Sequence, residues 1–282
     1  MALRFSTGFV NGLVGGVGYY ELMNGGKVEV YTGTQPSTAD TSPSGTLLFT
    51  GTLSSGTHTV EVKATCVINF TGFGGSITAF KIGSVPIINT TVDTGTSVAN
   101  AANNLATGIN SYYSYPDYFA VSDGVSAVTI YAPKGSGTAL NSLPVNVTFT
   151  TATMTCNGVS VSTGVDTTTT ALFGSGSGGS AAGVAAVNGV TFTYPPTSGT
   201  LAKSGTWTGT AVATGTAGWF RFKGGNYRTN AADSDATDTT TYLIRMDGSI
   251  GTSGTDMTVA NTSITSGASQ TINTFSLILP QT

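Results

Sequence analysis

The sequence predicts a mainly β protein, an antiparallel β-sandwich into which a small α+β domain is inserted. Only 8% of its 282 residues are charged, against about 25% in an average globular protein. Its polarity comes instead from Thr, Ser, Asn and Gly, which suit strands and tight turns, and Gly disfavours helix interiors. Short apolar runs separated by turn signals recur about every 8 to 12 residues, a spacing typical of a β-sandwich.

The strand pattern divides the sandwich into two halves, residues 1–56 and 181–282, around an inserted domain at 57–180. The Gly- and Ser-rich stretch ALFGSGSGGSAAG (171–183) marks the return from the insert to the sandwich. After it, strand-like runs resume with NGVTFTYPP, GTWTGTAVATG and AGWFRFKG, and they continue to INTFSLILP.

Within the first half, Phe5, Phe9 and Leu13 recur every four residues and favour a short helix, which the neighbouring glycines disfavour. KVEVYTG (27–33) alternates polar and apolar residues, as a half-buried strand does, and GTLLFTGTL (45–53) is the next predicted strand.

The insert has a different pattern. SITAFKIGSVPIINTTV (76–92) predicts a hairpin with Gly-Ser at its turn, and YFAVSDGVSAVTIYAP (118–133) predicts a second one with Asp-Gly at its turn. Between them, TSVANAANNLATGINSYYS (96–114) carries apolar residues at steps of three or four and predicts a helix that Thr or Ser caps. PVNVTFTTATMTC (144–156) predicts a further strand.

GWFRF gathers the bulkiest side chains of the chain and is a candidate protein interface. In a strand, Trp219 and Arg221 point to one face while Phe220 and Phe222 point to the other. The Phe face can fill the core, and Trp and Arg are the residue types enriched where proteins meet. The alternative is that Trp219 lies against a neighbouring loop of the same subunit.

SYYSYPDY is a second candidate interface, formed by Tyr112, Tyr113 and Tyr115, with Tyr118 just beyond them. Aromatic clusters of this kind stack on sugars or bind proteins. The alternative is that the end of the predicted helix packs onto its own sheet.

AADSDATDTTT is the densest group of acids, and its Asp233, Asp235 and Asp238 are weak candidates for a calcium site. Carboxylates at alternate positions can converge on one cation, but the glycine bend and distal Glu of an EF-hand loop are missing. A solvated loop is the alternative. No cofactor is predicted.

The remaining reactive residues do not predict an enzyme. The single histidine, His58, has no orienting partner nearby and no GxSxG motif accompanies it. Glu29 and Glu61 lie in alternating strands, where we expect them to face solvent. Cys66 and Cys156 lie in apolar, strand-like runs, where we expect buried thiols, and a single disulfide between them is the alternative.

Charge and hydropathy argue against two classes of partner. The net charge is −3, and no basic face of the kind that binds nucleic acid is evident. No run of about 18 apolar residues predicts a membrane-spanning helix. The opening MALRFSTGFV lacks the long apolar stretch of a signal peptide, so we expect the protein to be made and assembled in a cytoplasm.

Several segments resemble, in order, a family of small tailed-bacteriophage virion proteins. They are RFSTG (4–8), VEVYTGTQPSTAD (28–40) with GTLL (45–48), TAGWFRF (216–222), RMDGSIGTSGTDM (245–257) and NTFSLILP (273–280). Shorter members of the family run almost directly from the GTLL strand to the strand before GTWTG, which supports an insertion here. The insert is similar to a module of phage tail-sheath and other structural proteins, on GGSITAFKIGSVPI, TSVANAANNLATGIN and YFAVSDGVSAVTIYAPKGSGTALN.

The resemblance implies an accessory structural protein of the virion, present in many copies that decorate the capsid or dock at the neck or tail. Its expected partners are other virion proteins and copies of itself, and its expected location is the virion, after assembly in the host bacterial cytoplasm. The family has no catalytic residues to carry over. The alternative is a receptor- or glycan-binding module, in which the tyrosines of the insert recognise the host surface.

Overall fold

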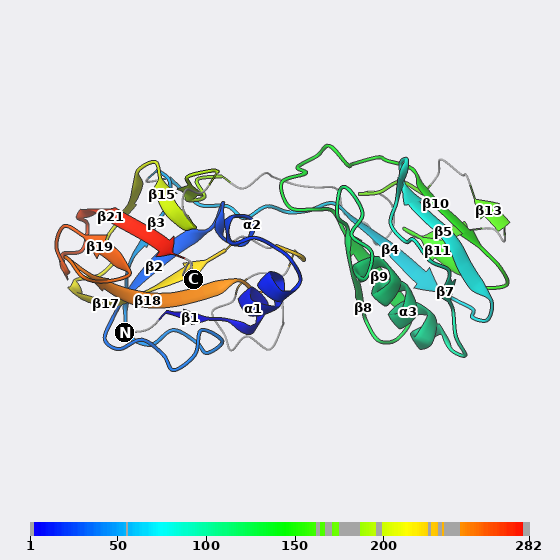
Figure 1. Cartoon of the computed structure of the whole chain (residues 1–282), viewed down its shortest axis with the longest axis horizontal. Coiled ribbons are helices and arrows are strands. Elements are labelled where there is room, and N and C mark those ends of the chain that lie inside the picture. Colours follow the sequence, from blue (N-terminus) through cyan, green and yellow to red (C-terminus); the bar gives the residue numbers. More distant parts are fainter. Residues whose placement is uncertain are drawn as a thin grey trace. The chain divides into compact units, whose positions relative to one another are not determined.

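The computed structural model describes residues 3–54, 56–161, 164–166, 171–174, 187–195, 199–224, 227–230, 233 and 243–278. The protein is mainly β, as the sequence predicts. It divides into two compact units, shown in Figure 1: unit 1 comprises residues 1–61 and 186–282, and unit 2 comprises residues 62–185. The predicted boundaries, at 56/57 and 180/181, lie close to these divisions.

Unit 1 is built on an eleven-stranded sheet. Its main strands, in spatial order, are β14 (Thr191–Phe192), β15 (Thr200–Ser204), β21 (Ser269–Ile278), β19 (Met257–Val259), β18 (Arg245–Gly251), β17 (Gly215–Lys223), β2 (Lys27–Thr32) and β3 (Leu47–Gly51). Three short strands pair beside this path: β1 (Arg4–Phe5) with β18, β16 (Trp207–Thr210) with β21, and β20 (Ser263–Ile264) with β17. Among the pairs described, only β18 and β19 run parallel.

This sheet curls around one core. Phe49 and Thr52, in and just after β3, bridge to Ala211 and Thr208, while β16 itself pairs with β21. Strands near both ends of the sheet therefore meet at β16. The core consists of packed apolar side chains. Aromatic rings from β14, β16, β17 and β21 contact one another in its centre; they include Phe192, Trp207, Phe220, Phe222 and Phe275.

Two short helices precede the first long strand: α1 (Thr7–Val14) and α2 (Tyr19–Met23). Ser6 caps α1, because its hydroxyl accepts the backbone N–H of Phe9 at 3.2 Å. The helix tolerates Gly12 for a packing reason: a Cβ there would lie 2.7 Å from a methyl group of Leu22 in α2. The glycine therefore lets the two helices approach closely.

Unit 2 encloses a single core between two five-stranded sheets and one helix. One sheet contains β13 (Gly164–Asp166), β10 (Val145–Phe149), β5 (Ser76–Ile82) and β6 (Val85–Pro86), with β7 (Val92–Asp93) also paired to β5. The other contains β12 (Val159–Val161), β11 (Met154–Cys156), β4 (Thr65–Phe70), β9 (Ala127–Tyr131) and β8 (Phe119–Ser122). Helix α3 (Val98–Asn110) packs on β7, β8 and β9.

Local signals explain most of these elements. The Ser97 hydroxyl caps α3 by accepting the N–H of Asn100 at 3.1 Å. In the β8–β9 hairpin, one carboxylate oxygen of Asp123 accepts three backbone N–H groups at 2.8 to 2.9 Å. The prediction of a single strand at 144–156 is wrong: the chain turns at Thr151, whose φ is 64°, and β10 and β11 join different sheets.

In the part of the chain that the structure describes, no helix is long and apolar enough to span a membrane.

Candidate functional site

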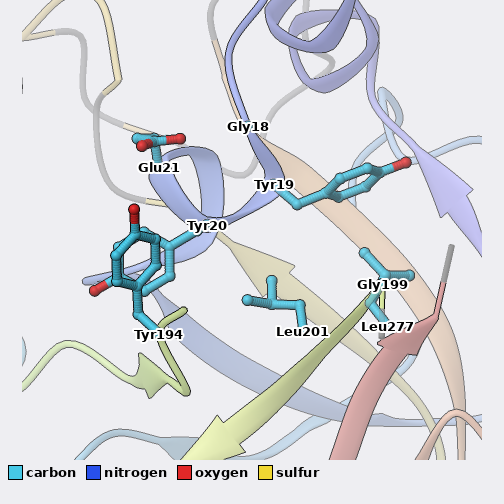
Figure 2. Close-up of a pocket in the computed structure, with 8 residues that line it drawn as sticks. All are labelled: Gly18, Tyr19, Tyr20, Glu21, Tyr194, Gly199, Leu201 and Leu277. Atoms are coloured by element: carbon cyan, nitrogen blue, oxygen red, sulfur yellow. The ribbon is translucent and has the colours of Figure 1, made fainter. Parts of the chain in front are cut away.

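A pocket of about 430 Å³ opens in unit 1, where α2 meets residues that follow it by more than 170 positions. We call it the tyrosine pocket, and it is lined by Gly18, Tyr19, Tyr20, Glu21, Tyr194, Gly199, Leu201 and Leu277 (Figure 2). The floor of the pocket consists of Leu201 of β15 and Leu277 of β21. These residues lie side by side because they are directly paired in the sheet. Both leucines are buried.

Tyrosine rings form the walls. The rings of Tyr20 and Tyr194 lie side by side, with centroids 4.7 Å apart and planes inclined at 45°. Tyr19 lies across the pocket from them (Figure 2), and its ring packs against Phe5 and Phe9 at 6.3 and 5.6 Å. Core packing thus fixes Tyr19, whereas Tyr194 is 67% exposed at the mouth.

Glu21 is the charged residue among those that line the pocket. Within the described part of unit 1 it is also the one charged residue that is exposed, the others being buried or half-buried. Its Oε2 atom lies over the start of α2, so that a Cβ at Gly18 would come within 2.7 Å of it. The absence of a side chain at Gly18 therefore leaves room for the carboxylate beside the aromatic walls.

A separate group of charges lies on β2, β17 and β18, on the face turned away from the apolar core. Glu29 accepts hydrogen bonds from Tyr31 at 2.7 Å and pairs with Lys223 at 2.8 Å and with Lys27 at 2.6 Å. Burial alone would raise the pKa of Glu29, but the two lysines outweigh it and hold that pKa below its ordinary value.

Arg221 and Asp247 form the centre of the same face. Two nitrogens of the guanidinium donate to the two carboxylate oxygens at 2.7 Å each, and a third donates to the Thr41 carbonyl at 2.8 Å. Burial raises the pKa of Asp247, and the hydrogen bonds from Arg221 oppose that rise. These charges are paired inside the fold, so we assign the group a structural role.

Trp219 and Arg221 are not available as an interface, because both are fully buried within unit 1. The indole stacks on Tyr31 with ring centroids 4.8 Å apart, and its N–H donates to the Ser44 carbonyl at 3.3 Å. This is the alternative arrangement, in which the tryptophan lies against a loop of its own subunit. The expectation that Glu29 and Glu61 face solvent is also wrong, since both are buried.

The tyrosine cluster of unit 2 divides into two parts. Tyr115 and Tyr113 are 97% and 67% exposed beyond the end of α3, whereas Tyr112 is half-buried and Tyr118 is buried. Tyr118 packs in the core of unit 2, with its ring centroid 5.6 Å from that of Phe173, while Tyr113 and Tyr115 stay at the surface.

Of the acidic candidates, Asp233 pairs with Arg245, whose Nε donates to it at 2.9 Å. Asp235 and Asp238 lie outside the described residues. Among the residues that are described, no three His, Cys, Asp or Glu side chains are grouped to hold a metal ion. Cys66 and Cys156 are buried free thiols whose sulfur atoms lie 3.2 Å apart.

Sequence reasoning did not single out the residues of the tyrosine pocket. The local signals were GYYEL and TYPP, two short aromatic runs in separate halves of unit 1. Nothing in either run indicates that α2 packs beside the end of β14. Comparison with protein-family models, with curated proteins and with solved structures finds no match to this chain.

Proposed function

We propose that this protein is an accessory structural subunit of a tailed-phage virion, held in many copies on the capsid or at the neck or tail by protein–protein contacts. The proposal starts from the sequence resemblance described above. The structural observation that supports it is the burial of charged side chains in unit 1. Arg221, Lys223, Arg245, Glu29 and Asp247 are all buried.

Because these charges are inside, the exposed residues of unit 1 are mainly Thr, Ser, Asn and Gly. Burying such a surface against a neighbour avoids the cost of desolvating ions. It also avoids repulsion between identical copies, which face one another with the same charge in a symmetric array. Many weak contacts repeated over a lattice then supply the affinity that one contact lacks.

Gradient-purified particles test this proposal. We expect mass spectrometry to find the full chain in the particle fraction, in a copy number set by the symmetry of the shell or tail. An antibody raised against the purified chain should label the particles at regular positions in electron micrographs. A chain found only in the soluble fraction of the lysate would refute the proposal.

A second candidate function rests on the exposed side chains of Tyr113 and Tyr115. Two exposed aromatic rings on one loop can stack on sugars or contact a receptor. Under this alternative, the purified chain binds host cells and a Tyr113→Ala/Tyr115→Ala variant does not, while its melting temperature is unchanged. Under the structural proposal alone, both proteins leave the cells unbound.

A further inference from the structure

We propose that Asn110 blocks the association of this chain with a second copy along the edge of β8, because its side chain occupies the backbone groups with which a strand of that copy would pair. The proposal is independent of the virion role, since it rests on hydrogen bonds within unit 2. Three observations support it: the position of β8 in its sheet, the two hydrogen bonds of Asn110 and the packing of α3.

Strand β8 is the last strand of its sheet in the part of the chain that the structure describes, and it pairs there with β9. In an antiparallel pair, alternate residues exchange hydrogen bonds with the partner strand, and the residues between them direct their N–H and C=O groups outward. The turn shows which are which, because the Asp123 N–H donates to the Ala127 carbonyl at 2.9 Å. Val121 therefore faces β9, and Ala120 faces the outer edge. Outward groups of this kind are a template for another strand.

Both outward groups of Ala120 are bound by Asn110. The Ala120 N–H donates to Asn110 Oδ1 at 2.8 Å, and Asn110 Nδ2 donates to the Ala120 carbonyl at 2.8 Å. A primary amide offers an acceptor and a donor, as a peptide group does, so the side chain makes the contact that a neighbouring strand would make. Two residues earlier, the Tyr118 N–H donates to the Ser114 hydroxyl at 3.3 Å. Two successive positions on this edge therefore have side-chain partners.

The helix that carries Asn110 holds its amide in place. Asn110 is the last residue of α3, and Ala101, Leu105 and Ile109 of the same helix are fully buried in the core of unit 2. The helix also packs on β8 itself. A second strand can pair at Ala120 only by breaking both hydrogen bonds and moving the end of α3. This barrier matters most where many copies lie side by side, because neighbours raise the local concentration of strand edges.

Asn110→Ala tests the proposal, because it removes the amide and opens the backbone groups of Ala120. At low protein concentration, we expect hydrogen exchange at the Ala120 amide to become at least about tenfold faster than in the parent. As the concentration is raised, light scattering on a sizing column should show a species of about twice the mass of the parent. Asn110→Ser, whose shorter side chain cannot reach both groups, should behave in the same way. Unchanged exchange, or the mass of the parent at every concentration, would overturn the proposal.

Two further variants separate an open edge from a loss of stability. Gly108→Ala strains the same helix against Val92 and leaves Asn110 in place, so it should melt at a lower temperature and keep the mass of the parent. Asn110→Asp still accepts the Ala120 N–H, and symmetric pairing of two copies along β8 would bring two carboxylates together. We expect this variant to keep the mass of the parent as well. Association of Gly108→Ala to the same extent as Asn110→Ala would show that instability drives it, and the proposal would be wrong.

Discussion

Cys66 and Cys156 lie with their sulfur atoms 3.2 Å apart, and both side chains are buried. Contact with Cys156, followed by burial, raises the pKa of the Cys66 thiol. Thiolates are the reactive form, so we expect the native protein to react far more slowly with an aromatic disulfide reagent than the denatured protein, which should release two equivalents. Rapid reaction of the native chain would contradict this, and so would an intact mass lower than that of the dithiol form by two hydrogen atoms, as a disulfide gives.

Glu29 contacts Lys27, Lys223 and Tyr31 on the charged face of unit 1. Its pKa is below the ordinary value of a glutamate, so its ion pairs stabilise the fold fully above about pH 4.3, the pKa of an unfolded chain, and are lost as the pH falls through the folded pKa. Glu29→Gln breaks buried contacts with Lys223 and Tyr31, and we expect it to cost about 3 kcal/mol. Urea unfolding at pH 7 and pH 3 measures both effects.

The matched control for that substitution is Glu21→Gln, because Glu21 is an exposed carboxylate on the same unit. It should change the free energy of unfolding by less than about 0.5 kcal/mol. Stability of Glu29→Gln equal to that of the parent at pH 7 would show that the buried pairs contribute no net stability.

At the scale of elements, we predict that an alanine within α3 lowers stability, which is the opposite of what helix propensity alone predicts. Gly108 lies within the helix, where alanine is ordinarily favoured by about 1 kcal/mol. A Cβ at this position, however, would lie 2.6 Å from a methyl group of Val92 in β7, and overpacking of this kind costs about 1 to 3 kcal/mol. We therefore expect Gly108→Ala to destabilise unit 2 in thermal unfolding, while Asn103→Ala, on the exposed side of the same helix, stabilises it slightly.

The elements show what local sequence determines here. The α3 cap and the β8–β9 turn were predictable because Ser97 and Asp123 satisfy backbone groups within four residues of themselves. Alternation in β17 correctly separates Trp219 from Phe220, but it does not show that the second face is covered. The second face is covered by the loop that contains Thr41 and Ser44, whose carbonyls accept hydrogen bonds from Arg221 and Trp219. This loop lies about 180 positions earlier in the chain, so no local sequence pattern indicates the contact.

At the scale of the whole molecule, the candidate site was hidden for the same reason. The tyrosine pocket joins α2 to Tyr194, Leu201 and Leu277, so it exists only once the curled sheet has brought three distant segments together. The mainly β class, in contrast, was predictable because it follows from the composition and spacing of the entire chain rather than from one contact.

The two units have separate cores, and we expect each to unfold on its own. The two segments of unit 1 meet where Thr59 and Val187 exchange backbone hydrogen bonds at 3.1 Å in each direction. A short Gly-Ser linker can therefore replace residues 62–185 without separating these partners. We expect the shortened chain and the isolated 62–185 segment each to melt cooperatively, at temperatures that match two transitions of the full protein.

Fluorescence assigns those transitions, because both tryptophans, Trp207 and Trp219, lie in unit 1. The change in tryptophan emission should follow one transition, and circular dichroism should follow both. Glu29→Gln should then lower only the transition seen by fluorescence, and Gly108→Ala only the other. A single transition shared by both probes, shifted equally by either substitution, would instead mean that the insert and its host unit fold as one cooperative body.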